Sequence, residues 1–205
     1  RLLTDFPNSR FLEYALYSLG WLYLEKDDYI NALAYLHKFE LYFPNSSLLS
    51  KIQFMIAQAL SGSGEFKEAN KRLVSLLKTK AISDAYREQS YFLLAENSYR
   101  LDDLPNAYLN YLKIKEDFPN SPYYQQSIYR IALITFKQDK WVEAIPYFNE
   151  IIRLNPAHQE KEAILFYIAM SYFHLGKFDD SLSFFDKQIQ SFPRGNFLLP
   201  ALAKR

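Results

Sequence analysis

The residue types that most often carry chemistry in proteins are few and scattered in this sequence. The three histidines, His37, His158 and His174, do not form the His-x-x-x-His spacing by which one helix face binds zinc. The chain has no cysteine, so disulfides and thiolate chemistry are excluded. We therefore expect no metal site, no cofactor and no catalytic histidine.

One short stretch has the look of a phosphate-binding loop. Ser61-Gly62-Ser63-Gly64 is rich in glycine, but it lacks the Gly-Lys-Ser/Thr ending of such loops and no strand pattern precedes it. We interpret it as a turn between two helices.

Three pairs of aspartates could bind a cation or act as acid and base. Each pair falls at the start of an expected helix, where negative charge complements the helix dipole, so we interpret them as capping residues. No nucleophile stands in a recognisable arrangement with a base, and we expect that the protein is not an enzyme. The pairs are Asp27-Asp28, Asp102-Asp103 and Asp179-Asp180.

Aromatic side chains are the unusual feature of the composition, at 18% of the 205 residues. Such side chains build large cores or large binding surfaces. The apolar fraction of 49% argues against disorder, and a net charge of +1 offers no basic surface for nucleic acid. The longest apolar run, residues 163–170, is too short to span a membrane. Membrane anchoring by another part of the protein stays open.

The chain repeats itself at a period of 37 to 38 residues. The sequence Phe-Pro-Asn-Ser occurs at residues 6–9, 43–46 and 118–121, and prolines recur at 7, 44, 119, 156 and 193. The one double gap contains Ala81 where a proline is expected. A fixed period of this length is typical of stacked-repeat proteins.

Each period holds two helical patterns, with apolar residues at three- and four-residue spacing. The first pair covers residues 10–25, with Ser9 as the N-cap, and residues 28–42, which end before Pro44. Pro146 lies inside a second helix and should kink it or free the carbonyl of Val142. The other pairs are expected at 47–61 and 65–78, 84–101 and 103–117, 122–138 and 140–154, and 158–175 and 177–191.

The domain prediction is a single repeat array over residues 1–205. Its repeats are placed at about 9–45, 46–82, 83–120, 121–157 and 158–194, with partial helices at 1–6 and 196–205. The first partial helix resembles the end of a repeat and the last resembles a beginning, so we interpret the sequence as a fragment of a longer protein.

Small residues recur in register with this period, one in each helix. A small side chain lets two helix backbones approach closely, so these positions, which we call the small-residue markers, are expected at the helix contacts. The markers are Gly20, Ala57, Ala95, Ala132 and Ala169 in the first helices and Ala32, Ala69, Ala107, Ala144 and Ser181 in the second.

The markers and the residues around them resemble the signature of the tetratricopeptide repeat. Its signature of a bulky residue, a glycine and a tyrosine, then an alanine-centred helix and a closing proline, is matched by Leu16, Leu19, Gly20, Tyr23, Ala32, Leu36 and Pro44. Alanine replaces the glycine in four copies, and the period exceeds the usual 34. The resemblance implies an all-α right-handed superhelical solenoid of about five antiparallel helix pairs, with partial repeats at both ends.

In this family the first helices line a concave groove, and three series of residues share that face here. Most of these residues are aromatic, and they could either pack against one another or bind a partner. Arg100, Arg130 and Lys137 add positive charge near the groove. The candidate partner-binding residues are Tyr17, Phe54, Phe92, Tyr129 and Phe166; Trp21, Gln58, Glu96, Leu133 and Met170; and Leu24, Tyr99, Phe136 and Phe173.

The expected function is therefore a non-catalytic scaffold that binds a partner peptide or amphipathic helix in the groove. Two alternatives stay open, a structural or oligomerisation module and a small-molecule or lipid carrier. The long period and the Phe-Pro-Asn-Ser turns resemble bacterial envelope proteins of the outer-membrane assembly lipoprotein and Tol–Pal-associated coordinator type. That resemblance implies a periplasmic or envelope location, with the cytoplasm as the alternative, and a protein partner of unknown identity.

Overall fold

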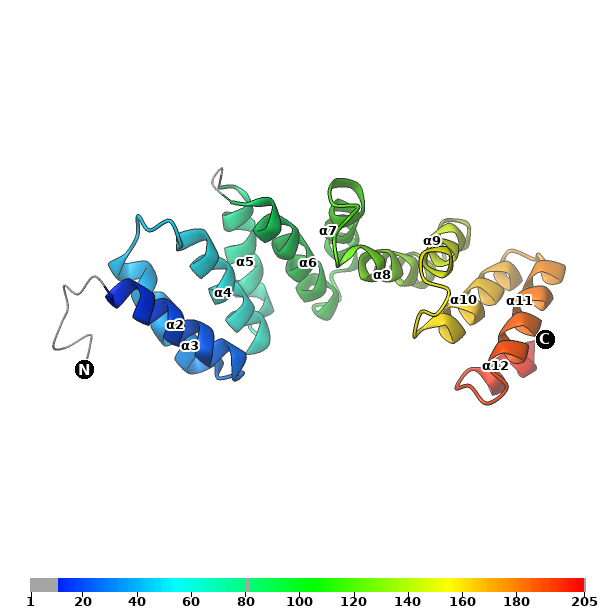
Figure 1. Ribbon diagram of the computed structural model, residues 1–205. Coiled ribbons are helices and arrows are strands. Elements are labelled where there is room, and N and C mark those ends of the chain that lie inside the picture. Colours follow the sequence, from blue (N-terminus) through cyan, green and yellow to red (C-terminus); the bar gives the residue numbers. More distant parts are fainter. Residues whose placement is uncertain (1–10, 80–81, 205) are drawn as a thin grey trace. The chain divides into compact units, whose positions relative to one another are not determined.

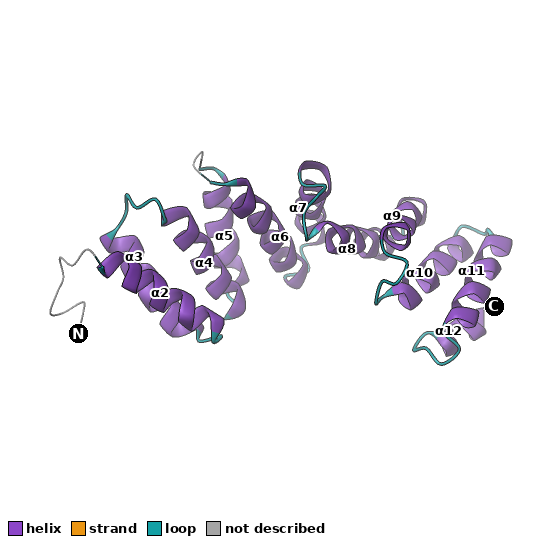
Figure 2. Ribbon diagram, in the orientation of Figure 1, coloured by secondary structure: helices purple, strands orange, loops and turns teal. Residues whose placement is uncertain are grey.

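The computed structural model describes residues 11–79 and 82–204, which form eleven α-helices and no strand (Figures 1 and 2). The predicted partial helix at residues 1–6, the Ser9 cap and Ala81 lie outside the described residues. Every other predicted helix is present. The helix α9 (Trp141–Leu154) continues through Pro146, so this proline does not end the helix. The side chain of Pro146 is exposed.

Contacts divide the chain into two compact units, residues 1–110 and 111–205, which are described separately. The helix α7 (Leu104–Asp117) contains the boundary. Unit 1 contains α2 (Leu12–Glu25), α3 (Tyr29–Tyr42), α4 (Leu49–Gly62), α5 (Phe66–Leu77) and α6 (Asp84–Arg100). Unit 2 contains α8 (Tyr124–Lys137), α9, α10 (Lys161–His174), α11 (Phe178–Ser191) and α12 (Leu198–Lys204).

Within each unit, helices pack in chain order. In unit 1, α2 packs on α3, α3 on α4, α4 on α5 and α5 on α6, and the first helices α2, α4 and α6 also contact one another in sequence. In unit 2, the same order joins α8, α9, α10, α11 and α12. Each helix pair therefore contacts mainly its neighbours, which is the packing of a solenoid.

The small-residue markers lie at the helix contacts, and all ten are buried. A Cβ atom added at Gly20 would lie 2.5 Å from Cδ2 of Leu36, so α2 and α3 meet more closely there than a larger residue allows. Ser181 shows how a polar residue replaces alanine at such a contact. Its hydroxyl donates a hydrogen bond of 2.9 Å to the carbonyl oxygen of Ala169, which satisfies the buried group.

The turn inside each helix pair has one residue in the left-handed backbone region. The five positions recur at the repeat period, and their φ angles are 55° at Asp27, 87° at Gly64, 57° at Asp102, 58° at Asp139 and 70° at Gly176. Glycine and aspartate are among the residues that tolerate this conformation best.

The structure corrects the interpretation of two aspartate pairs as capping residues, because only one aspartate of each pair caps a helix. The first member, Asp27 or Asp102, supplies the left-handed turn residue. Only the second member caps a helix: Asp28 accepts from the backbone N–H of Asn31 at 3.2 Å, and Asp103 accepts from that of Asn106 at 3.3 Å. Asp179 and Asp180 lie in the first turn of α11, as expected.

Among the described residues, the Phe-Pro-Asn-Ser copies at 43–46 and 118–121 form turns between helix pairs. The hydroxyl of Ser46 accepts a hydrogen bond from the backbone N–H of Leu48 at 3.0 Å, and Ser121 accepts from Tyr123 in the same way at 3.0 Å. At the equivalent place in the next turn, Nδ1 of His158 accepts from the backbone N–H of Glu160 at 3.1 Å. This histidine therefore has a local structural role.

Candidate partner-binding groove

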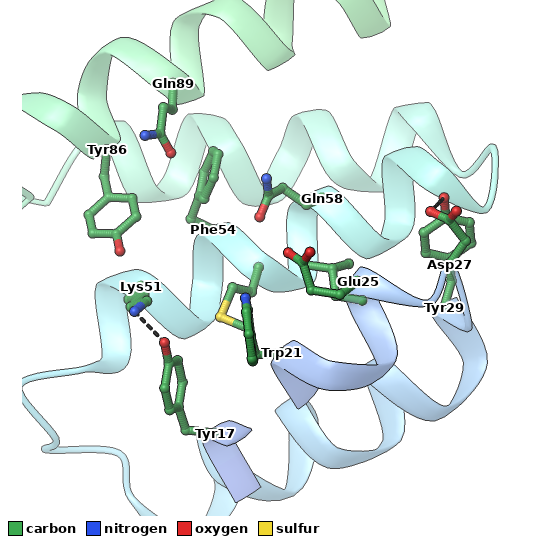
Figure 3. Close-up of a pocket in the computed structure, with 12 residues that line it drawn as sticks. Tyr17, Trp21, Glu25, Asp27, Tyr29, Lys51, Phe54, Gln58, Tyr86 and Gln89 are labelled. Atoms are coloured by element: carbon green, nitrogen blue, oxygen red, sulfur yellow. Dashed lines mark hydrogen bonds between the residues drawn. The ribbon is translucent and has the colours of Figure 1, made fainter. Parts of the chain in front are cut away.

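The first helices of unit 1 line two adjoining cavities on the face that the sequence predicts. Cavity A has a volume of about 510 Å³ and is lined by residues of α2, α4 and α6, of the turn before α3 and of the start of α3 (Figure 3). Cavity B has a volume of about 440 Å³ and is lined mainly by α4 and α6. Tyr29 and Gln58 line both cavities, so we treat the two as one groove.

Most of the unit 1 residues that the sequence nominates line this groove. Cavity A is lined by Tyr17, Trp21, Leu24, Phe54 and Gln58. Cavity B is lined by Gln58, Glu96 and Arg100.

Two nominated residues of α6, Phe92 and Tyr99, are half-buried and line neither cavity. Gln89 and Leu93 occupy that wall instead, at a spacing that continues to Glu96. The face of α6 that lines the cavities is therefore rotated away from the nominated aromatic residues Phe92 and Tyr99.

The aromatic residues of cavity A differ in how much surface they offer a partner. The side chain of Trp21 is 48% exposed, whereas that of Phe54 is 4% exposed and packs with its ring centroid 5.6 Å from that of Tyr86. Phe54 therefore belongs to the wall of the cavity, while Trp21 presents an open ring. Exposed aromatic side chains are common anchors of protein interfaces.

Lys51 is a groove residue that sequence reasoning missed. Its ammonium donates a hydrogen bond to the hydroxyl of Tyr17 and lies 4.4 Å from the centroid of that ring (Figure 3). The hydrogen bond raises the pKa of Lys51 above its usual value, so the residue carries a positive charge at neutral pH. Burial likewise raises the pKa of Tyr86, which lines the same end of the cavity.

These missed residues lie nearer the start of each helix than the nominated series. Lys51 and Gln89 precede their markers by six residues, and Tyr86 precedes its marker by nine. Continuing the nominated series toward the start of each helix in three-residue steps would have reached these positions.

The opposite end of cavity A is acidic. Glu25 and Asp27 are exposed and line the cavity together with Tyr29. The hydroxyl of Tyr29 donates to Oδ1 of Asp27 at 2.7 Å, and this hydrogen bond raises the pKa of Tyr29. Cavity A thus has a cation at one end, an open tryptophan within it and two carboxylates at the other end.

Unit 2 has a separate cavity of about 740 Å³ on α8, called cavity C. It is lined by the nominated residues Tyr129, Arg130 and Leu133. Amide side chains line it further, namely Gln125, Gln126, Asn155 and Gln159. The nominated Lys137 is exposed and does not line this cavity.

The remaining nominated residues of unit 2 pack against other rings. The ring centroid of Phe136 lies 4.9 Å from those of both Trp141 and Tyr167. Phe166 lies 5.0 Å from Phe197. Phe173 lies 5.7 Å from Phe178, and Met170 packs against a buried cluster that contains Phe185.

Metal-binding clusters and membrane-spanning helices are two further features to consider in the described part of the chain. Residues 11–79 and 82–204 contain no group of three or more histidine, aspartate or glutamate side chains placed to hold a metal ion. Among the helices of those residues, none has the length and apolar character that crossing a membrane requires.

Solved structures share this fold at low sequence identity. MamA from Desulfovibrio magneticus RS-1 is 12% identical over 90% of this chain and 97% of its own, with a TM-score of 0.70. A tetratricopeptide repeat protein from Parabacteroides merdae is 17% identical over 93% of this chain and 70% of its own, with a TM-score of 0.74. YrrB, described as having an unusual peptide-binding site, is 16% identical over 90% and 88%, with a TM-score of 0.71.

Sequence comparison gives the family. No curated protein sequence matches the chain. A tetratricopeptide-repeat model matches residues 14–46, and the model described as YfiO, outer membrane lipoprotein, matches residues 83–197, more than half of the chain. The fold is thus an all-α tetratricopeptide solenoid, and the chain belongs to the YfiO outer membrane lipoprotein family.

Proposed function

We propose that this protein is a non-catalytic interaction scaffold that binds a partner peptide or amphipathic helix in the groove of unit 1. The observation that carries the proposal is the open ring of Trp21, 48% exposed inside a cavity of about 510 Å³. An exposed tryptophan beside Leu24 and Gln58 offers apolar area together with an amide that can hydrogen-bond to a partner backbone.

The family supports a place for this scaffold in the cell envelope. The matching model describes outer membrane lipoproteins, and we propose that the chain works in a bacterial envelope assembly on the periplasmic side. A cytoplasmic location is the alternative. Among the structural neighbours, YrrB is described as having a peptide-binding site, which supports a peptide as the type of partner.

In unit 2 we propose that some of the nominated residues bind the partner and that others have a structural role. Tyr129, Arg130 and Leu133 in cavity C contribute to binding. Phe136 and Phe166 build the wall, because their rings pack on Trp141, Tyr167 and Phe197 at 4.9 to 5.0 Å. The alternative for this face is a structural or oligomerisation module that packs on the rest of its own chain.

A lipid or small-molecule carrier is less well supported by the linings. A chain-binding pocket is largely apolar. The groove of unit 1 has Lys51, Glu25, Asp27 and Arg100 in its lining, and cavity C is rich in amides.

Site-specific photo-crosslinking of the full-length protein in its native cells tests the proposal. A probe at Gln58 lies in the groove, and a probe at Lys71, which is exposed on α5, is the matched control. We expect Gln58 to capture a discrete protein that Lys71 does not capture. Equal labelling from both positions would contradict the proposed binding groove.

A further inference from the structure

The charges at the two ends of cavity A lack counter-ions within the described part of the chain. Lys51 donates to the neutral hydroxyl of Tyr17 and has no carboxylate within ion-pair distance. Glu25 and Asp27 have no cationic partner among the same residues. These three charges therefore remain available to a bound molecule.

Two cations on a second helix of the same unit behave differently. Arg72 on α5 approaches Glu40 on α3 at 2.8 Å, and Lys71 approaches Glu68 at 2.9 Å. These cations are neutralised by carboxylates of the protein itself, whereas the charges that line cavity A are left for a partner to neutralise.

The two charged ends are separated by a length that helix geometry defines. Tyr17, which holds Lys51, and Glu25 are eight residues apart on α2, which corresponds to about 12 Å along the helix axis. Trp21 lies midway between them, one turn from each (Figure 3). A partner helix lying along α2 would reach the same three levels with residues four and seven or eight positions apart on one face.

We propose that the partner of this groove is an amphipathic helix with an acidic and a basic side chain seven or eight residues apart and apolar residues between them. The acidic side chain pairs with Lys51, the basic one pairs with Glu25 and Asp27, and the apolar residues cover Trp21. This inference rests on the proposed function, since it specifies the chemistry of the partner that the groove binds.

The physical basis is charge complementarity. A bound helix removes water from the cavity, so its charges meet those of the groove in a medium less polarisable than bulk water. Two like charges that face each other in such an interface repel each other, and this repulsion weakens the binding of the wrong partner. The groove should therefore select partners by the signs of the two end charges.

Three synthetic helical peptides test this selection against the full 205-residue chain. They share one apolar face and differ only in the two end residues, which are Glu and Lys, Lys and Lys, or Glu and Glu. Fluorescence anisotropy of the labelled peptides gives the dissociation constants. We expect the Glu–Lys peptide to bind about fivefold more tightly than either of the others, and the preference to weaken as salt is raised.

Reversing one charge should exchange the preference. In Lys51→Glu, the Lys–Lys peptide should become the tightest binder, and in the neutral variant Lys51→Met the Glu–Lys peptide should lose its advantage over Lys–Lys. Lys67→Glu makes the same reversal at an exposed position of α5 and should leave the wild-type order unchanged. Trp21→Ala should weaken all three peptides, which locates their binding in cavity A.

The outcomes separate this inference from the proposed function. Equal binding of the three peptides, still weakened by Trp21→Ala, would overturn the charge selection and leave a peptide-binding groove in place. An unchanged order in Lys51→Glu, with the helical content of the variant intact by circular dichroism, would overturn it too. Failure of all three peptides to bind would reject this partner chemistry, while photo-crosslinking at Gln58 judges the proposed function independently.

Discussion

Left-handed turn residues connect the sequence to the fold at the level of single positions. Asp27, Gly64, Asp102, Asp139 and Gly176 recur at the repeat period and all have positive φ. Three of these residues are aspartates and two are glycines, and this difference in type obscured the common cause in the sequence. One physical requirement, a backbone conformation that places Cβ near the following carbonyl, selects both types.

The substitution Gly176→Ala tests this requirement. A Cβ at this position meets no atom within 4 Å, so any cost comes from the backbone and not from a clash. With φ at 70°, we expect the free energy of unfolding to fall by about 1–2 kcal/mol in urea titrations. Gly176→Asp, which introduces the residue found in three other repeats, should recover part of the loss. Equal stability of all three proteins would contradict the explanation.

The small-residue markers act at the level of helix pairs. They were identified from the sequence because one buried position per helix has to stay small in every repeat, whichever larger residues surround it. Ser181 replaces alanine without leaving a buried hydroxyl unsatisfied, because it donates to Ala169 at 2.9 Å. Sequence reasoning could note the serine but could not supply this partner, which lies on another helix.

Enlarging a marker should disturb the contact between helices. Ala144 on α9 is fully buried in a cluster with Ile128, Ala132 and Phe148, so Ala144→Leu forces these neighbours apart. We expect a loss of about 1–3 kcal/mol in the free energy of unfolding, measured by urea titration.

The neighbouring substitution Glu143→Leu is the matched control, because Glu143 is exposed on the same helix. It should change the free energy of unfolding by less than about 0.5 kcal/mol. If both variants lost a comparable amount of unfolding free energy, the loss in Ala144→Leu could not be attributed to overpacking at the helix contact.

At the scale of the whole molecule, several groups favour their protonated form in the folded protein. Burial raises the pKa of Tyr86 and of Tyr124, and hydrogen bonds raise those of Tyr29 and Lys51. A group whose pKa is higher in the folded than in the unfolded state stabilises the fold below its unfolded pKa. That contribution disappears as the pH rises through its folded pKa.

Because these pKa values are raised in the folded protein, we expect the protein to lose stability at alkaline pH. The urea midpoint should be level around neutral pH and fall above about pH 10, where tyrosine and lysine begin to lose their protons in the unfolded chain. Tyr124→Phe removes one contributing phenol and should make the decline shallower. A midpoint that does not change between neutral pH and about pH 11 would contradict the shifts.

The sequence by itself determined the helix pairs, their turns and their contacts, because these depend on local periodicity and on small residues that recur in register. It also nominated the face that holds Tyr17, Trp21 and Gln58. Only the tertiary structure decided which of these aromatic residues are open, since the exposure of Trp21 and the burial of Phe54 depend on the helices beside them. The pairing of Lys51 with Tyr17 joins residues 34 positions apart on neighbouring helices, so no local pattern could reveal it.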